Sequence, residues 1–402
     1  MSDKSTCVIV GGGPAGLFLG LMLARAGVDV TVLEKHADFL LEFRGDTDHP
    51  VTMRLLDELG LFEKFDRLPQ SRVERGEFDV GGRLHTLVDF RRLKLPHPYV
   101  AMVPQWDLLG LIAETAAVEQ TFTLRMQTEA TGLLRGGDTV TGVRYTSPDG
   151  PGELRADVVV GCDGRTSVVR RDARLPTREY PVTFDVWWFR LPREKGGQYS
   201  LIPRTKPGRA LIMIPREGYF QIAYLIPKGS DSELRARGLD AFHREIADMI
   251  PEASAETITS WDDVKVLDVR LDRLRRWHGS GVLCIGDAAH AMSPVGGVGI
   301  NLAIADAVAA AGHLAQPLLS GLLTDRDLAA VRRRRIVPTV ATQTLQRVLH
   351  RQVLAPVLQG RQTTPPTPLL TLVERVPALT AIPAYLVGVG LMPQHAPDFA
   401  RR

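Results

Sequence analysis

The sequence predicts an α/β fold that combines a doubly wound, Rossmann-like domain, a second domain built on a β-sheet, and a helical carboxy-terminal region. Three observations predict it. The chain opens with a strand, a glycine-rich loop, a helix and a strand; two later strand-like runs end in CDG and GDAAH; and alternating apolar and polar runs lie between them. With 402 residues, 44% of them hydrophobic, the chain can bury the large core that such a fold needs.

The opening segment has the pattern of a βαβ unit. Residues 6–10 are strand-like, and residues 14–26 carry the apolar spacing of a helix, which Gly27 ends. Residues 28–33 then form a second strand-like run. We expect the two strands to be parallel, with the helix packed across them.

The loop of this unit matches the dinucleotide-binding fingerprint GxGxxG through Gly11, Gly13 and Gly16. These glycines allow a tight turn, close approach of the backbone to a pyrophosphate, and close packing of the helix, whose amino end faces phosphate. Glu34 ends the second strand at about the 20-residue offset expected of a ribose-binding acid, which also disfavours a 2′-phosphate. The site is therefore predicted to bind FAD or NAD, unless Glu34 is only a solvated strand-end carboxylate.

The strand pattern returns at residues 156–161 and 281–285, so the nucleotide-binding domain is predicted to be discontinuous. Helical spacing is seen over 230–250 and 298–314, and the tail after Arg332 is helical but rich in proline. The runs expected to form an antiparallel sheet are 78–90, 182–191, 198–203, 209–214 and 219–226. The predicted division assigns 1–73, 99–178 and 270–330 to the nucleotide-binding domain, 74–98 and 179–269 to the substrate domain, and 331–402 to the carboxy-terminal helical region.

Composition excludes some classes of partner. A formal net charge of +3, from 49 basic and 46 acidic residues, is too balanced for a nucleic-acid-binding face. The amino-terminal residues lack the features of a secretory signal, and no uninterrupted apolar stretch reaches the roughly 20 residues of a spanning helix. Cys7, Cys162 and Cys284 lie in strand-like runs, which favours buried reduced thiols and a cytoplasmic location.

Three spaced motifs together resemble the FAD-dependent aromatic hydroxylases, the p-hydroxybenzoate hydroxylase-like group A flavoprotein monooxygenases. They are GGGPAG with Glu34, the stretch DVVVGCDGRTSVVRR at 157–171, and the stretch GVLCIGDAAHAMSPVGGVGINLAIADA at 281–307, in the order of the family. The resemblance implies non-covalent FAD, NAD(P)H as co-substrate, and O2. No second GxGxxG is present, which agrees with transient nicotinamide binding without a separate Rossmann domain.

The resemblance also implies a set of FAD-binding residues. Asp287 is expected to contact the ribityl chain, and the glycines before Asn301 to let the backbone pass against the flavin ring, with the next helix pointing its positive end at the pyrimidine edge. His290 is expected to hold the turn rather than to act as a base. The complete expected set is Gly11, Gly13, Pro14, Ala15, Gly16, Glu34, Lys35, Arg44, Gln105, Asp163, Asp287, Pro294, Gly297, Gly299, Ile300 and Asn301.

Several residues keep two interpretations. Asp46, Asp48 and His49 either contact the flavin or substrate or are ordinary polar residues of a loop. Of the three, His49 is the catalytic candidate. No metal site is expected. The pair Trp187 and Trp188 does not match the WxWxIP signature of flavin halogenases and is expected to line the substrate wall. The run 332–335 is a solvated helix surface or an anion-binding site. Apolar residues over 369–391 pack, close the substrate tunnel, or touch a membrane surface.

The leading functional hypothesis is a monooxygenase that uses NAD(P)H and O2 to hydroxylate a small, largely apolar, aromatic or polyketide-like substrate through a flavin C4a-hydroperoxide. One alternative is an oxygen-independent flavin reductase of isoprenoid double bonds. Another is an FAD-stabilised protein that binds a ligand without turnover. The substrate, the choice between NADH and NADPH, and the oligomeric state are not predicted by the sequence.

Overall fold

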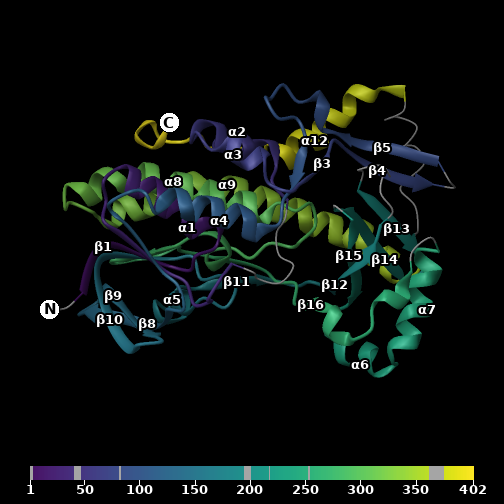
Figure 1. Cartoon of the computed structure of the whole chain (residues 1–402), viewed down its shortest axis with the longest axis horizontal. Coiled ribbons are helices and arrows are strands. Elements are labelled where there is room, and N and C mark those ends of the chain that lie inside the picture. Colours follow the sequence, from purple (N-terminus) through teal and green to yellow (C-terminus); the bar gives the residue numbers. More distant parts are fainter. Residues whose placement is uncertain are drawn as a thin grey trace.

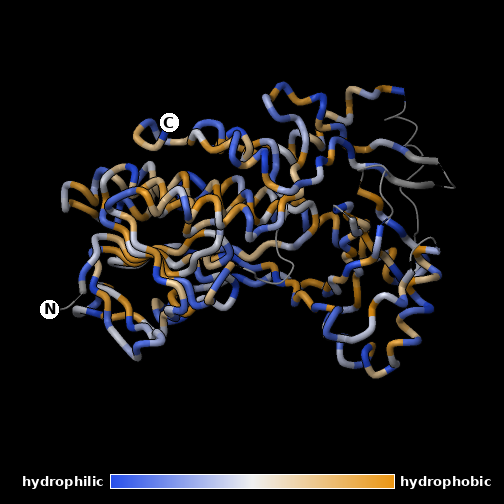
Figure 2. Tube along the Cα trace, in the orientation of Figure 1, coloured by the Kyte–Doolittle hydropathy of each residue, from blue (hydrophilic) through white to orange (hydrophobic). Residues whose placement is uncertain are grey.

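The computed structural model describes residues 3–39, 47–80, 83–193, 201–216, 218–251, 254–361 and 375–402. In Figure 1 a large sheet and its covering helices fill one half of the molecule, and a second sheet with its own helices fills the other. Hydrophobic residues concentrate in the strands and in the helices that lie on them (Figure 2). This arrangement confirms the predicted fold class, while the exact segment boundaries stay a prediction.

The large sheet has eight strands in the order β18-β19-β10-β1-β2-β7, with β9 paired to β10 and β8 to β9. Strand β1 is parallel to β2 and β10, and β10 is parallel to β19. The register places Val10, Gly161 and Cys284 side by side, so the three motif loops leave the same edge of the sheet. The strands are β1 (Asp3–Val10), β2 (Val30–Leu33), β7 (Phe122–Arg125), β8 (Glu129–Gly136), β9 (Thr139–Ser147), β10 (Gly150–Gly161), β18 (His278–Gly279) and β19 (Val282–Cys284).

Helices α1 (Pro14–Arg25), α4 (Gln105–Ala116), α8 (Gly299–Leu319) and α9 (Asp325–Leu349) cover one face of this sheet (Figure 1). Helix α1 packs against α4 and α8, and α8 packs against α9. Every residue of α1 from Ala15 to Ala24 is buried, because its sequence is apolar on all sides. The predicted helix at 14–26 is thus confirmed.

Helix α8 bears on the expectation that no uninterrupted apolar stretch reaches the length of a spanning helix. It is the one helix, in the part of the chain that the structure describes, that is long and apolar enough to do so by composition. However, 61% of its most apolar window is buried inside the protein, between α1 and α9. Asp306 near its middle is fully buried and paired, so α8 serves as a core helix here.

The second sheet is antiparallel, in the order β13 (Ile202–Lys206), β14 (Arg209–Pro215), β15 (Tyr219–Pro227), β12 (Phe184–Pro192) and β16 (Lys265–Leu267). One face packs on α7 (Leu239–Met249), and Trp187 lies there, 5.5 Å from the Phe242 ring. The other face carries Trp188 and packs with Val295 from the GDAAH segment. Neighbouring strand residues point to opposite faces, so the expectation that both tryptophans line one wall is wrong for Trp187.

Two other sequence predictions need correction. Residues 78–90 do not join the antiparallel sheet: β4 (Arg75–Val80) and β5 (Arg83–Asp89) pair with each other, and one isolated bridge joins Gly76 to Leu201. The helix expected over 230–250 is divided into α6 (Asp231–Ala236) and α7, because Gly238 adopts a φ of +86° between them. Residues 198–200 lie outside the described residues. The other small sheets pair β3 (Ser71–Val73) with β6 (Val100–Met102) and β11 (Thr177–Tyr180) with β17 (Leu271–Leu274).

The carboxy-terminal region returns to the start of the fold. Arg25 in α1 donates a 2.7 Å hydrogen bond to the carbonyl of Ala400, and Figure 1 shows the C-terminus beside α2. Helix α12 packs on β5 and on the short helix η1. The remaining helical segments are α2 (Pro50–Glu58), α3 (Phe62–Asp66), η1 (Phe90–Arg92), α5 (Val168–Asp172), η2 (Ala255–Thr257), η3 (Trp261–Asp263), η4 (Gly286–Ala288), η5 (His350–Leu354), α10 (Ala355–Leu358), η6 (Pro377–Thr380), α12 (Ala381–Gly388) and η7 (Asp398–Ala400).

Candidate active site

The glycine-rich loop between β1 and α1 combines close packing with one open position. A Cβ on Gly11 would lie 2.5 Å from the carbonyl oxygen of Cys162, and one on Gly16 would lie 1.9 Å from that of Gly11. Among the described residues, no atom lies within 4 Å of the Cβ position of Gly13. Helix α1 begins there without a side-chain cap or an acid in its first turn, so its first N–H groups face open space. This cradle fits a pyrophosphate.

Glu34 lies at the end of β2 and is bound to the same loop. Its carboxylate accepts hydrogen bonds from the backbone N–H of Gly12 at 2.8 Å and of His36 at 3.0 Å. The residue is only 6% exposed, so it is not a solvated strand-end acid. Lys35 follows it and is exposed.

Asp163 shapes the turn after β10. Its carboxylate accepts hydrogen bonds from the Ser167 hydroxyl at 2.5 Å and from the backbone N–H of Val169 at 3.1 Å, which holds the first turn of α5. Burial raises the pKa of Asp163, although these hydrogen bonds oppose the rise. The carboxylate is thus occupied within the motif, and its contact with a cofactor stays a prediction.

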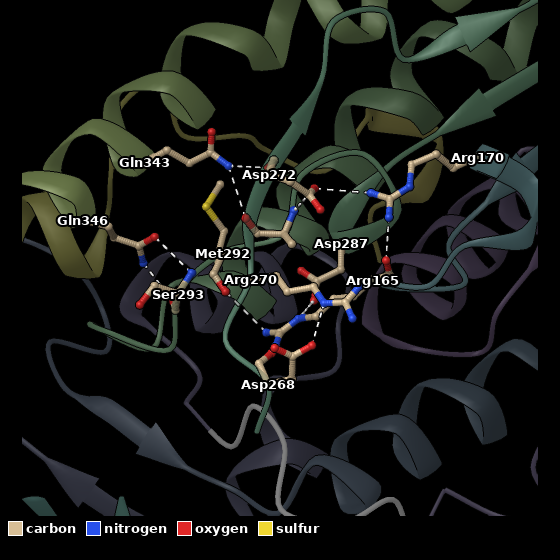
Figure 3. Close-up of polar contacts among 11 residues, drawn as sticks. Arg165, Arg170, Asp268, Arg270, Asp272, Asp287, Met292, Ser293, Gln343 and Gln346 are labelled. Atoms are coloured by element: carbon tan, nitrogen blue, oxygen red, sulfur yellow. Dashed lines mark hydrogen bonds and ion pairs between the residues drawn. The ribbon is translucent and has the colours of Figure 1, made fainter. Parts of the chain in front are cut away.

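Arg165 joins the second and third motifs and was not singled out by the sequence. Its Nε lies 3.1 Å from the carboxylate of Asp287, and its Nη1 and Nη2 donate to the carbonyls of Asp268 and Met292, each at 3.3 Å (Figure 3). The Asp287 side chain is 33% exposed, so part of it faces open space. Only the position of Arg165 within the stretch 157–171 could have indicated this role.

A buried ionic triad holds the GDAAH turn. The Nε2 of His290 lies 2.5 Å from the Asp306 carboxylate, which also pairs with Arg335 at 2.8 Å and accepts from the Gly286 N–H at 3.1 Å. Burial opposes ionisation of Asp306, yet the charges of His290 and Arg335 hold its pKa below the ordinary value. This geometry agrees with the expectation that His290 holds the turn.

Helix α9 fixes the loop that follows GDAAH. Gln346 accepts from the Ser293 N–H at 3.2 Å and donates to the carbonyls of Ser293 and Val295, each at 2.9 Å. Gln343 donates to the carbonyls of Asp272 and Ala291, and Figure 3 shows both amides directed at this segment. The sequence analysis missed these glutamines. Their i, i+3 spacing on one helix face was the available signal.

Gln346→Ala should weaken FAD binding because three hydrogen bonds to the loop would be lost and buried carbonyls left without donors. Each unsatisfied buried group costs about 1–3 kcal/mol, so the dissociation constant of FAD should rise by about tenfold or more. Fluorescence titration of the apoprotein with FAD measures this. Gln352→Ala removes an exposed amide six residues further along the chain, so this variant should bind FAD like the wild type. Equal affinity of both variants would contradict the role of Gln346.

Asn301 connects the start of α8 with the segment that precedes α2. Its Oδ1 accepts from the His49 N–H at 3.0 Å and the Thr52 hydroxyl at 2.7 Å, and its Nδ2 donates to the carbonyl of Thr47 at 2.9 Å. Gly297 has a φ of +61°, and a Cβ there would meet Thr47 at 2.9 Å. The side chain of Asn301 is therefore satisfied by the protein, and only backbone groups at the start of α8 remain for a ligand.

Two helices begin beside these loops: α8 has no acid in its first turn, whereas α4 has Asp107 there. Helix α8 starts at Gly299 and Ile300 with no side-chain cap and no acid in its first turn, so its positive end can face an anionic group. Gln105 is the first residue of α4 and is half-buried. Arg44 and Asp46 lie outside the described residues. Asp48 forms backbone hydrogen bonds with Ala101 at 2.8 and 2.9 Å.

His49 is buried at the start of α2, with 1% of its surface exposed. Its Nδ1 lies 2.7 Å from the carbonyl of Val387 in α12 and must donate to it, which leaves Nε2 as the acceptor nitrogen. Nε2 has no hydrogen-bond partner among the described residues. Burial lowers the pKa of His49 to about 4, so the ring is neutral at pH 7.

The buried His49 should make stability depend on pH. The unfolded histidine binds a proton near pH 6.5, whereas the folded one does so only near pH 4, so the stability falls as the pH falls between these values. The loss from this group between pH 7 and pH 5 is about 2 kcal/mol. In urea unfolding, His49→Gln should therefore lose about 2 kcal/mol less than the wild type over this interval. Identical losses in the two proteins would show that His49 titrates normally.

Comparison with known proteins agrees with this geometry. Residues 4–344 match the family described as FAD binding domain. The chain is 33% identical to 6-methylpretetramide 4-monooxygenase of Streptomyces rimosus over 380 residues, 93% of this chain and 90% of the relative. It is 30% identical to 12-dehydrotetracycline 5-monooxygenase/anhydrotetracycline 6-monooxygenase of Streptomyces rimosus subsp. rimosus over 317 residues, 75% of this chain but only 60% of that longer relative. The fold matches the crystal structure of PqsL, a probable FAD-dependent monooxygenase from Pseudomonas aeruginosa, with a TM-score of 0.75, 23% identity, and coverage of 93% of this chain and 100% of that one.

The fold and these comparisons together define an FAD-binding flavoprotein built around a parallel sheet. The chain belongs to the FAD-binding-domain family of flavoprotein monooxygenases, the group that contains the aromatic hydroxylases, and it is an NAD(P)H-dependent flavin monooxygenase. The oxygen-independent reductase and the ligand-binding protein without turnover gain no support from these relatives.

Proposed function

We propose that the protein hydroxylates an aromatic ring of a polycyclic, polyketide-like phenolic substrate. The observation that carries this proposal is the 33% identity to 6-methylpretetramide 4-monooxygenase over 93% of the chain and 90% of that relative. The second sheet brings an apolar face to the loop proposed to carry the flavin. Phe184 and Ala223 on this face are buried, and the half-buried Trp188 and Val295 pack against the same cluster.

The proposed FAD site follows the edge of the large sheet. The adenosine and pyrophosphate would be held by Gly11, Gly13, Pro14, Ala15, Gly16, Glu34 and Lys35. The middle of the cofactor would be held by Arg44, Gln105, Asp163 and Asp287, and the ring by Pro294, Gly297, Gly299, Ile300 and Asn301. When bound, FAD would supply the redox chemistry, namely the acceptance of hydride from NAD(P)H and the activation of O2. Support comes from the open position at Gly13 and from the two uncapped helix starts.

The residues of the chain have three tasks in this proposal. The start of α8 and its backbone N–H groups stabilise negative charge at the pyrimidine edge of the ring. The apolar sheet face excludes water from the substrate. His49 has a neutral ring nitrogen, Nε2, without a partner among the described residues, and we assign it to accept a hydrogen bond from a substrate hydroxyl.

The cellular location and the state of the three cysteines complete the proposal. We place the protein in the cytoplasm, where NAD(P)H is available and thiols stay reduced. All three cysteines are free, and burial raises the pKa of the Cys162 and Cys284 thiols. Protonated, buried thiols are poor nucleophiles, so FAD is held without a covalent bond.

Asp287→Ala should lower the FAD content of the purified protein more than Glu34→Ala does. Asp287 would contact the middle of the cofactor, and its loss also leaves Arg165 without its carboxylate partner. A hydrogen bond to a charged group is worth about 1.5–3 kcal/mol, or about 10- to 150-fold in affinity. FAD released by heat, divided by protein concentration, gives the content. Unchanged content in folded Asp287→Ala protein would remove Asp287 from the site.

A substrate panel tests the proposed substrate class. FAD-loaded protein is mixed with NADH or NADPH, and nicotinamide oxidation is followed with polycyclic phenolic polyketides, with p-nitrophenol or resorcinol, and without substrate. A polycyclic phenol should accelerate oxidation and yield a product heavier by one oxygen atom. Stimulation and hydroxylation restricted to the monocyclic phenols would overturn the proposed substrate class while leaving the monooxygenase assignment intact.

A further inference from the structure

Apart from the proposed FAD site, the structure has a pocket of about 350 Å³ where β11 and β17 meet α9. We call it the arginine pocket, and its lining includes Arg178, Arg273, Arg275 and Arg332 around Leu274 and Ile336. None of these residues belongs to the proposed FAD site. The volume lies within the range of small-ligand sites, about 300–1,000 Å³.

The arginine pocket brings like charges together without neutralising them. Arg178 and Arg273 are directly opposite each other in the β11–β17 register, a placement that is destabilising for two cations. Nevertheless Arg273 is fixed in place, because it donates to the Tyr180 hydroxyl at 2.8 Å and to Gln343 at 2.9 Å. Within the described chain, no carboxylate forms an ion pair with the four arginines that line the pocket.

The surroundings of these arginines favour the binding of an anion. Burial, and then the charges of Arg178, Arg332 and Arg347, hold the pKa of Arg273 below its ordinary value, although Tyr180 opposes this. The Nε of Arg332 is buried and has no hydrogen-bond partner among the described residues. An anion in the pocket would satisfy this donor and relieve the repulsion.

We propose that the arginine pocket binds a phosphate group. Guanidinium groups present pairs of N–H donors that match phosphate oxygens, and several of them here face one small volume. Two sources carry this chemistry: a free phosphate or pyrophosphate, and the phosphates of the NADPH adenosine end. Two arginines of the run 332–335 therefore have different roles. Arg335 pairs inward with Asp306, whereas Arg332 lines the pocket. This inference does not depend on the proposed substrate class.

Calorimetric titration of FAD-loaded protein at constant ionic strength tests the proposal, since bound FAD keeps the other phosphate cradle filled. The probes are pyrophosphate, inorganic phosphate and adenosine 2′,5′-bisphosphate. AMP, which lacks the 2′-phosphate, is the control for the bisphosphate. Arg332→Gln and Arg178→Gln should each weaken binding of the preferred probe by about tenfold or more. Arg326→Gln removes one charge from an exposed position on α9 and should bind like the wild type.

The probes distinguish the two sources. Tighter binding of the bisphosphate than of pyrophosphate and AMP assigns the pocket to NADPH, whereas equal or weaker binding assigns it to a free anion. Either result supports a phosphate site if the losses are confined to Arg332→Gln and Arg178→Gln. Absence of saturable binding by every probe at about 1 mM, or an equal loss in Arg326→Gln, overturns the proposal. Unchanged FAD content confirms that each variant is folded.

Discussion

Gly13→Ala is expected to leave the fold intact and to abolish tight FAD binding. The Cβ added at this position meets no atom of the described residues within 4 Å, so it enters the space in front of α1. A pyrophosphate in that space would be displaced, at a cost of about 1–3 kcal/mol or roughly 5- to 150-fold in affinity. Urea unfolding of the apoprotein should differ from the wild type by only about 1 kcal/mol, the cost of alanine at a helix start.

Gly16→Ala provides the matched contrast on the same loop. Its Cβ would lie 1.9 Å from the carbonyl oxygen of Gly11, so helix α1 must move away from β1. We expect the free energy of unfolding of the apoprotein to fall by about 3 kcal/mol or more. If Gly13→Ala bound FAD like the wild type, or if both variants lost the same stability without FAD, the cradle would be assigned wrongly.

Asp306→Ala should cause the largest loss of stability outside the glycine loop. It leaves Arg335, which is 2% exposed, and His290, which is 1% exposed, without their shared carboxylate. Removal of one partner from a buried ion pair costs about 3–5 kcal/mol. FAD content should fall as well, because the turn that carries Asp287 is held by the same carboxylate through Gly286.

The pH dependence of this loss separates a charge effect from a packing effect. The folded pKa of Asp306 is depressed, so its ionised form stabilises the protein above the unfolded pKa of about 3.9, and this stabilisation is lost as the pH falls through the folded value. The difference between Asp306→Ala and the wild type should thus be complete at pH 7 and shrink below about pH 4. Asp138→Ala, at an exposed turn, should change stability by less than about 0.5 kcal/mol. A difference that stays constant down to low pH would indicate lost packing instead.

The sequence predicted the motif loops well because their chemistry is local. Gly16 is required by a contact within the βαβ unit, and Glu34 accepts from the N–H of Gly12, so for these residues the pattern and its physical cause occupy a short stretch. Gly11 differs, because it approaches Cys162 in the second motif. The parallel order of the strands then brings the CDG and GDAAH loops to the same edge. This is why the fold class could be predicted from the sequence, whereas the position of the FAD site at this edge stays a prediction.

Long-range partners could not be derived in this way. Gln346 is 53 residues from Ser293, and the Asp287 partner Arg165 is 122 residues away, so no spacing rule connects them. The fate of Trp187 depended on which strand face α7 covers, which the alternation alone does not fix. The predicted helix 298–314 contains Asp306, but its spacing gave no indication of the ion pairs with His290 and Arg335.

Labelled oxygen gas gives the most direct test of the monooxygenase account. FAD-loaded protein, NADH or NADPH, and the substrate selected by the panel are incubated under ¹⁸O₂ in ordinary water, and the product is analysed by mass spectrometry. We expect one labelled atom in the product, the other in water, and no product without oxygen. Equal product formation without oxygen, or oxygen derived only from the solvent, would contradict the account.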